Sequence, residues 1–353
     1  MTTTTTTSSM SGVASPLGSD LAIDARGLVK QFGSNRAVDG VDLAVPTGSV
    51  YGVLGPNGAG KTTTVSMLAT LLRPDSGSAK IFGYDVVHDS TAVRSLVGVT
   101  GQYASVDEDL TARQNLVVFA LLLGFSRKAA KTRADELLDE FSLTEAADRP
   151  LKDFSGGMRR RLDLAASLID TPPLLFLDEP TTGLDPRTRA QMWETIRRLV
   201  ADGATVLLTT QYLDEADQLA DRIAVIDRGR VIADDTADAL KSSVGAATLQ
   251  LAPLERADAP RVAEIVERVL DEPATLSAEA GRISAPLHRP DLVPDVLIAM
   301  RAEGITVDEI NVQKPSLDEV FLTLTGKPAE TDDGAAEAGD PNTDADSTHE
   351  ENN

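Results

Sequence analysis

The segment from Gly55 to Thr62 restricts the possible folds of this chain more than any other, because it has the glycine spacing and the Lys-Thr ending of a phosphate-binding loop. An apolar, strand-like run at 50–54 precedes it, and a run with apolar residues at helical spacing, 63–72, follows it. Backbone N–H groups in such a loop surround phosphate oxygens at a helix N-terminus, where anions are stabilised. A glycine-rich turn with an incidental lysine has little weight beside this pattern. The chain is predicted to bind a nucleoside triphosphate.

The residues of this loop have separate predicted roles. We expect the Lys61 ammonium to reach the β- and γ-phosphates and the Thr62 hydroxyl to hold Mg²⁺. The residues expected to surround the triphosphate are Gly55, Pro56, Asn57, Gly58, Ala59, Gly60, Lys61, Thr62 and Thr63.

Composition sets the class of protein. The 353 residues suffice for one large and one smaller domain, and the absence of cysteine excludes disulfides and thiolate sites. The longest apolar run, 116–125, is far shorter than the roughly 20 residues of a membrane helix. The Thr/Ser-rich start lacks the basic and apolar segments of a signal peptide. We therefore expect a soluble cytoplasmic protein.

The net charge of −22 argues against nucleic acid as a partner. Nine acidic residues and no Lys or Arg lie in 329–353, and without those nine the charge is still −13. Both ends, 1–18 and 329–353, lack apolar periodicity and are expected to be disordered. For the acidic tail, solubility is the favoured role and regulation the alternative.

Strand-like and helix-like segments alternate from 19 to 241, which predicts an α/β domain. The predicted strands are 21–30, 36–45, 79–82, 174–177, 205–209 and 223–226, and the predicted helical runs are 63–72, 115–123, 129–141 and 186–201. The first two strands suit an antiparallel subdomain, and 106–149 suits a helical one. The later alternation predicts a mainly parallel sheet covered by helices, with the phosphate loop at the carboxyl end of a strand.

A smaller unit is predicted at 242–328. Its expected elements are strands 246–252, 274–278, 282–286 and 305–313 and helices 259–270, 290–303 and 316–324. The order βαββαβ plus a helix is compatible with a ferredoxin-like α+β module. A structural extension and a docking or dimer-stabilising module are both open readings.

Two carboxylates, Asp178 and Glu179, follow directly on the apolar strand 174–177. A buried strand that ends in this way places them at the edge of the sheet where the phosphate loop lies. Asp178 then suits Mg²⁺ coordination, and Glu179 suits the orientation of an attacking water.

The sequence Ser155-Gly156-Gly157-Met158, called the signature segment below, precedes a helix-like run, 159–168. With the phosphate loop and the Asp-Glu pair it resembles the ATP-binding subunits of ABC transporters, over about 21–237. The N-terminus of the helix that follows the signature segment is a second anion site, which suggests that it faces another subunit's nucleotide. The resemblance implies that two copies pair head-to-tail and enclose two ATP, with Ser155, Gly156, Gly157 and Asp185 at the ATP of the opposite subunit. For the basic run Arg159-Arg160-Arg161, a solvated helix face is favoured.

Further positions match this resemblance. Phe32 fits the aromatic residue that stacks on adenine, with an ordinary core phenylalanine as the alternative, whereas Tyr51 suits a strand residue better. Gln102 fits the glutamine that touches Mg²⁺ and water and moves with the membrane partner. The segment 183–185 fits the loop that contacts the opposite subunit.

Gln211 departs from the pattern of the resemblance, in which a histidine contacts the γ-phosphate and helps to hold the catalytic glutamate. A glutamine amide can donate a hydrogen bond to phosphate but cannot become a cation or carry a proton. We predict that hydrolysis persists with Glu179 as base, but slowly.

The run 209–217, Thr-Thr-Gln-Tyr-Leu-Asp-Glu-Ala-Asp, and the ending 315–322, Pro-Ser-Leu-Asp-Glu-Val-Phe-Leu, are similar to the daunorubicin-resistance type of drug-export ATPase. In that group the ending is associated with assembly with the membrane subunit. The helix predicted at 316–324 has an apolar stripe, formed by Leu317, Val320, Phe321 and Leu324. This stripe must pack against either the chain's own domain or another subunit.

The sequence therefore predicts an ATPase subunit, peripheral to the cytoplasmic face of the membrane, that powers a separate permease exporting a hydrophobic drug or antibiotic. We expect the permease to dock between Gln102 and Ser155. The alternatives are a nucleotide-gated assembly or regulatory protein with little turnover and export of a non-drug substrate such as a lipid. A soluble ATPase acting on ribosomes or DNA is less favoured, because a second ATPase domain, a long coiled-coil insertion and basic patches do not appear.

Overall fold

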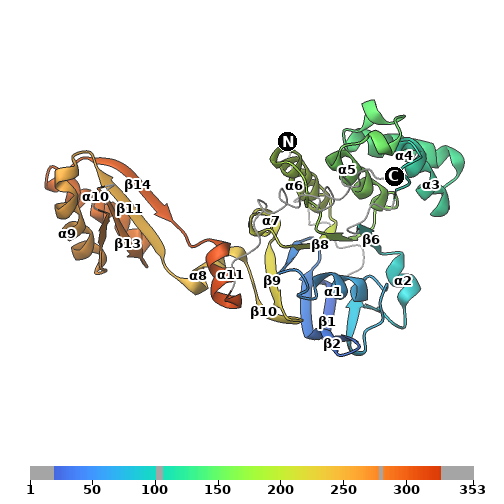
Figure 1. Ribbon diagram of the computed structural model, residues 1–353, viewed down its shortest axis with the longest axis horizontal. Coiled ribbons are helices and arrows are strands. Elements are labelled where there is room, and N and C mark those ends of the chain that lie inside the picture. Colours follow the sequence, from blue (N-terminus) through green and yellow to red (C-terminus); the bar gives the residue numbers. More distant parts are fainter. Residues whose placement is uncertain (1–19, 101–105, 278–280, 327–353) are drawn as a thin grey trace, which may run out of the picture.

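The computed structural model describes residues 20–100, 106–277 and 281–326. The predicted disordered ends, 1–18 and 329–353, and Gln102 lie outside these ranges. In Figure 1 the chain forms a large lobe and a smaller C-terminal lobe, which are joined by the helices α8 (Ala237–Val244) and α11 (Leu317–Thr325).

A six-stranded sheet forms the centre of the large lobe, in the order β10-β9-β3-β8-β7-β6. Its strands are β3 (Val50–Leu54), β6 (Val97–Thr100), β7 (Leu174–Asp178), β8 (Thr205–Thr210), β9 (Arg222–Asp227) and β10 (Arg230–Asp235). All neighbouring strands are parallel except β10, which is antiparallel to β9. Every residue of β3, β7 and β8 is buried, as continuous apolar strands covered on both faces should be. The predicted mainly parallel sheet is confirmed.

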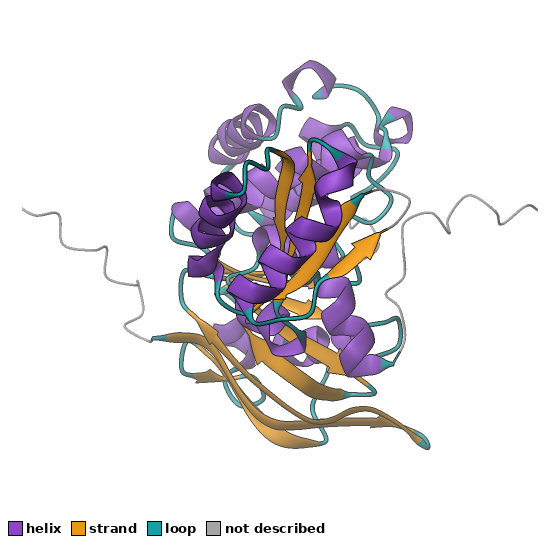
Figure 2. Ribbon diagram, turned by 90° about the vertical axis from the view of Figure 1, so that its left-hand side faces the viewer, coloured by secondary structure: helices purple, strands orange, loops and turns teal. Residues whose placement is uncertain are grey.

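An antiparallel sheet packs below this centre, along the base of the molecule in Figure 2. It has the order β2-β1-β4-β5, formed by β1 (Leu21–Phe32), β2 (Asn35–Pro46), β4 (Ser76–Ile81) and β5 (Tyr84–Asp85). The helix α1 (Lys61–Leu68) shares one apolar core with both sheets. The prediction extended this helix to residue 72, but it ends at Leu68, and Thr70 adopts a positive φ of 62°.

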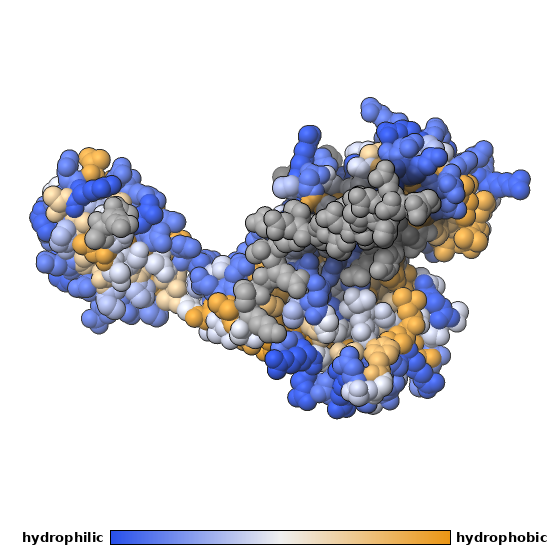
Figure 3. Space-filling model, viewed as in Figure 1, coloured by the Kyte–Doolittle hydropathy of each residue, from blue (hydrophilic) through white to orange (hydrophobic). Residues whose placement is uncertain are grey.

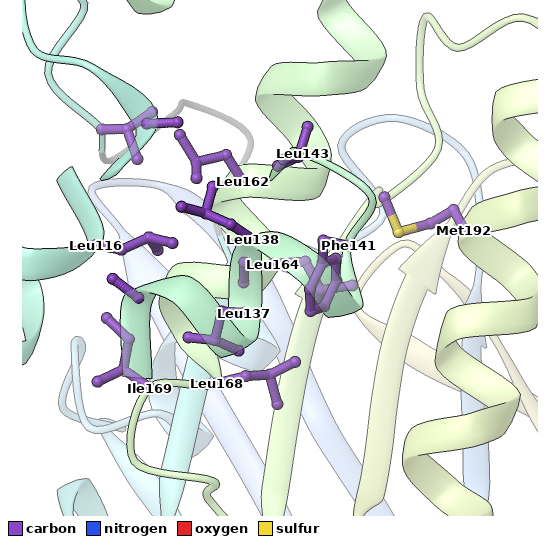
Figure 4. Close-up of a cluster of buried hydrophobic side chains, with 14 of the residues drawn as sticks. Leu116, Leu137, Leu138, Phe141, Leu143, Leu162, Leu164, Leu168, Ile169 and Met192 are labelled. Carbon is purple, nitrogen blue, oxygen red and sulfur yellow. The ribbon is translucent and has the colours of Figure 1, made fainter. Parts of the chain in front are cut away.

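Helices form the rest of the large lobe. They are α2 (Ser90–Arg94), α3 (Ala112–Leu122), α4 (Arg127–Glu140), α5 (Gly156–Ser167), α6 (Pro186–Ala201) and α7 (Leu213–Leu219). Figure 4 shows how α3, α4 and α5 bury a shared leucine-rich cluster, which includes Leu116, Leu137 and Leu162. Thr111 begins α3 with a capping box that Gln114 completes. The predicted helical subdomain is therefore a packed unit.

The C-terminal lobe contains a separate sheet in the order β12-β13-β11-β14, in which all neighbouring strands are antiparallel. Its elements are β11 (Ala247–Pro253), α9 (Ala259–Leu270), β12 (Thr275–Ser277), β13 (Arg282–Leu287), α10 (Val293–Ala302) and β14 (Val307–Gln313). The chain order is the predicted βαββαβ. Alternate residues Leu249, Leu251, Ile283 and Ala285 form a core with the two helices.

The last helix, α11, returns from this lobe to the large one. Leu317, Val320 and Phe321 are buried with residues of α7 and α8, whereas Leu324 is 38% exposed. Of the two packing partners left open by the sequence, the structure places most of this stripe on the chain's own large lobe.

Candidate functional site

The loop after β3 follows its path because two of its glycines lie against neighbouring backbone. A Cβ atom on Gly55 would lie 2.2 Å from the carbonyl oxygen of Ile226. A Cβ atom on Gly60 would lie 2.4 Å from that of Ala37, and Gly60 has a φ of +106°. Side chains at these positions are excluded, so the loop backbone itself lines a concave surface.

Lys61 begins α1 and is almost completely buried, with 4% exposure. Its ammonium donates to the carbonyl oxygens of Gly55 (2.6 Å) and Pro56 (3.2 Å) and lies 3.8 Å from a carboxylate oxygen of Glu179. These groups border a cavity of about 310 Å³. Its walls are the predicted loop residues from Pro56 to Thr63, together with Phe32, Asn35, Ala37 and Glu179.

The carboxylate of Asp178 lies at the end of β7, beside the start of α1. Its Oδ1 accepts hydrogen bonds from the hydroxyl of Thr62, at 3.3 Å, and from the hydroxyl of Thr209. A carboxylate and a threonine hydroxyl at this distance offer the hard oxygen ligands that Mg²⁺ prefers. The two residues predicted to hold the metal are thus neighbours.

Glu179 has a strained backbone, with a φ of +48°. Its N–H donates to the carbonyl oxygen (3.0 Å) and the hydroxyl oxygen (3.2 Å) of Thr209. Its carboxylate accepts from the Thr182 hydroxyl at 3.4 Å and lines the cavity. Sequence reasoning missed Thr209, which binds the Asp178 carboxylate and the backbone N–H of Glu179. The available signal was a threonine at the end of a buried strand adjacent to β7.

The signature segment caps α5. Ser155 is its N-cap, and its side chain accepts from the Met158 N–H at 3.3 Å. Ser155 and Gly156 are exposed. A Cβ atom on Gly157 would lie 2.5 Å from Cγ2 of Thr188, so this glycine permits the close approach of α5 and α6.

Asp185 is the N-cap of α6. Its carboxylate accepts from the Thr188 hydroxyl (2.6 Å) and from the N–H groups of Thr188 (3.0 Å) and Arg187 (3.1 Å). These hydrogen bonds, that of the Thr188 hydroxyl first, lower the pKa of Asp185. Asp185 is exposed, and Thr188, which it binds, is also the residue that a Cβ atom on Gly157 would meet.

Gln211 follows β8. Its Oε1 is buried and has no hydrogen-bond partner within the described residues. Glu215, in α7, is fully buried and accepts from Trp193 Nε1 at 3.3 Å, and burial raises its pKa. No pattern in the sequence singles out this glutamate.

The prediction of a solvated basic helix face at 159–161 is wrong for two of the three arginines. Arg159 forms an ion pair with Glu108 at the surface, at 2.6 Å. Arg161 is partly buried and donates to the carbonyl oxygen of Phe141 at 3.1 Å. Arg160 is partly buried and donates to backbone carbonyls at the end of β7. The helical spacing of apolar residues did not reveal these contacts, because arginine is usually exposed and its position in a helix does not indicate a buried partner.

The two aromatic candidates lie in different surroundings. Phe32 is 49% exposed, lines the cavity, and has the Lys30 ammonium 5.7 Å from its ring centroid. The alternative that Phe32 is an ordinary core residue is therefore excluded. Tyr51 is buried within β3, and its hydroxyl donates to Asp234 at 2.7 Å, so its prediction as a strand residue is confirmed.

Within the described residues, none of the helices has the length and apolar character required to cross a bilayer.

Known proteins share this architecture and sequence. A family model described as ABC transporter matches residues 38–182. The Daunorubicin/doxorubicin resistance ATP-binding protein DrrA of Streptomyces peucetius is 56% identical over 88% of this chain and 94% of its own length. The Daunorubicin resistance ATP-binding protein DrrA2 of Streptomyces coeruleorubidus is 53% identical over 86% and 95%. A solved dimeric ATP-binding cassette in a post-hydrolysis state with ADP and Pi is 25% identical, with a TM-score of 0.56, over 61% of this chain and 98% of that chain.

Identities above half, over nearly the whole length of these relatives, settle the family. The phosphate loop, the Asp178-Glu179 pair and the signature segment all occur in the fold that this family uses to bind and hydrolyse ATP. The chain is an ABC-type ATPase that belongs to the daunorubicin-resistance ATP-binding proteins of the ABC transporter family.

Proposed function

We propose that this ATPase energises a separate membrane permease that exports a hydrophobic drug or antibiotic. The relatives whose names refer to daunorubicin and doxorubicin resistance support the substrate class. The observation that carries the proposal is the convergence of Lys61, Thr62 and Glu179 on one cavity, with the Asp178 carboxylate hydrogen-bonded to the Thr62 hydroxyl beside it.

In the proposed mechanism the loop N–H groups and Lys61 bind the β- and γ-phosphates, and Phe32 stacks on adenine. Thr62 and Asp178 would hold Mg²⁺, with Gln102 as a further proposed ligand, and the ion would supply positive charge beside the phosphates. Glu179 accepts a hydrogen bond from the attacking water and orients it toward the γ-phosphorus. Gln211 donates a hydrogen bond to the γ-phosphate, but its amide cannot become a cation or transfer a proton, so turnover is slow.

The proposed site is completed by a second copy of the chain. Ser155, Gly156 and Asp185 are exposed, and none of them lines the cavity. A head-to-tail dimer brings the N-terminus of α5 to the partner's γ-phosphate, where the helix dipole and free N–H groups stabilise negative charge. ATP closes this dimer and hydrolysis reopens it, which drives alternating access in the permease.

The permease docks in a groove between β6, α3 and α5, of about 310 Å³, in our proposal. Its walls include Gly98, Phe119, Leu122, Leu123 and Asp163. Leu122 and Leu123 are 77% and 53% exposed, and an apolar patch is visible at this end of the lobe in Figure 3. Exposed leucines beside a groove are typical of an interaction surface.

Co-expression with a candidate permease tests this function. We expect the chain to be recovered with the membrane fraction, to co-purify with the permease, and to hydrolyse ATP faster in the complex. A chain that stays wholly soluble beside its permease contradicts the transport role. Absence of turnover with and without the permease favours a nucleotide-gated assembly role instead.

A further inference from the structure

Arg160 contacts the peptide groups that carry the catalytic carboxylates. It lies in α5, about one turn after Ser155. Its Nη2 donates to the carbonyl oxygens of Asp178 (2.6 Å) and Glu179 (3.0 Å), and its Nε donates to that of Pro180 (3.0 Å). The planar guanidinium thus binds three consecutive carbonyl oxygens with its fixed fork of donors.

Burial gives these contacts their strength. Desolvation lowers the pKa of Arg160, and the charges of Asp163 and Asp178 oppose this shift. A guanidinium stays charged in such surroundings, and hydrogen bonds from a charged donor are stronger than neutral ones. A partly buried guanidinium that binds three backbone carbonyls is unlike the solvated side chains of a surface helix.

The segment it binds is strained. Glu179 has a φ of +48°, a conformation that persists only where the surroundings fix it. Thr209 binds the N–H of Glu179, and Arg160 binds its carbonyl oxygen. Both peptide groups of the residue are therefore held, one from β8 and one from α5.

We propose that Arg160 is a positioning residue for hydrolysis, which ties the signature helix α5 to the backbone of Glu179 and so fixes where its carboxylate meets the attacking water. This inference rests on the proposed function, in which Glu179 orients that water. Because Ser155 begins the same helix, movement of α5 on dimer closure is transmitted by the arginine to Glu179.

The test compares Arg160→Gln, Arg160→Lys and Arg133→Gln in the full-length chain. Arg133 is a matched control, because it donates to the carbonyl oxygens of Leu168 (2.8 Å) and Ile169 (3.1 Å) at the other end of α5, away from the carboxylates.

We expect Arg160→Gln to lower kcat roughly ten- to a hundredfold, as a misplaced catalytic group does. The Kd for trinitrophenyl-ATP should stay within about twofold, because ground-state binding is not affected. Arg160→Lys should restore part of kcat, since an ammonium lacks the planar fork. Arg133→Gln should keep kcat.

Two results would overturn the inference. One is unchanged kcat in Arg160→Gln. The other is a parallel loss of kcat, ATP binding and thermal midpoint in both glutamine variants, which indicates general destabilisation. The Glu179→Gln variant distinguishes failure of the role of Arg160 from failure of the proposed role of Glu179. If it retains turnover, the proposed role of Glu179 fails first, whatever Arg160→Gln does.

Discussion

At the scale of single residues, Thr209 contacts both Asp178 and Glu179 although no motif marks it. Its hydroxyl donates to Asp178 and accepts from the N–H of Glu179. The Thr209→Val variant keeps the shape and removes both bonds. We expect it to lower the free energy of unfolding by about 1–3 kcal/mol, because a buried carboxylate loses a partner. Denaturant titration measures this. Thr195→Val is the control, since the Thr195 hydroxyl donates to the helix carbonyl of Gln191 and a comparable loss there would contradict the account.

Gln211 leads to a prediction about rate. We expect Gln211→His to raise steady-state kcat by about tenfold, the effect of about 1.4 kcal/mol of added transition-state stabilisation. A histidine can act as a cation toward the γ-phosphate, which glutamine cannot. The measurement is phosphate release at saturating ATP. If kcat is unchanged while Glu179→Gln abolishes turnover, glutamine serves as well as histidine here and the slow-turnover argument is wrong.

At the scale of elements, the contact between α5 and α6 depends on Gly157. A Cβ atom there meets Thr188, whose χ1 is fixed by its bond to Asp185. We expect Gly157→Ala to lower the thermal midpoint, and the double change with Thr188→Ser, which removes the obstructing methyl group, to recover part of the loss. Gly156→Ala is the control for stability, because a Cβ there meets nothing within 4 Å. Equal losses in both alanine variants would contradict this steric explanation.

The helix α11 provides a second test. Phe321 is 3% exposed against α7 and α8, whereas Leu322, beside it, is 49% exposed. We expect Phe321→Ala to remove about 3–5 kcal/mol of stabilisation from this contact. Faster hydrogen exchange of the α11 amides would report it. Leu322→Ala should leave that exchange unchanged, and similar behaviour of the two variants would show that α11 is not anchored by its buried face.

Apolar periodicity predicted most elements and the sheet type, because buried strands and amphipathic helices leave direct patterns in the sequence. The loop and the Asp178-Glu179 pair were predictable because their chemistry requires particular residues in order. Arg160 was not, since its role depends on β7, which lies beside α5 only after folding. The packing of α11 was undecided for a similar reason: a stripe of apolar residues does not identify its partner.

At the scale of the whole molecule, the cavity at the phosphate loop and the groove between β6, α3 and α5 have no lining residue in common. Docking and hydrolysis can therefore be separated by mutation. We expect Leu122→Asp to prevent co-purification with the permease and leave ATP binding unchanged, because a charge is placed in an apolar contact. Leu71→Asp is the matched control, since Leu71 is 70% exposed in the turn after α1, outside the groove. Loss of permease binding in both variants would contradict the proposed location.

The proposal that ATP lies between two copies of the chain is tested most directly by the mass of the Glu179→Gln variant in solution. With ATP and Mg²⁺, light scattering after gel filtration should give a dimer that retains one ATP per chain, and removal of nucleotide should return the monomer. Ser155→Arg in the same background should prevent the dimer, because it places a bulky cation at the N-terminus of α5. A monomer that stays monomeric when saturated with ATP would contradict the composite site.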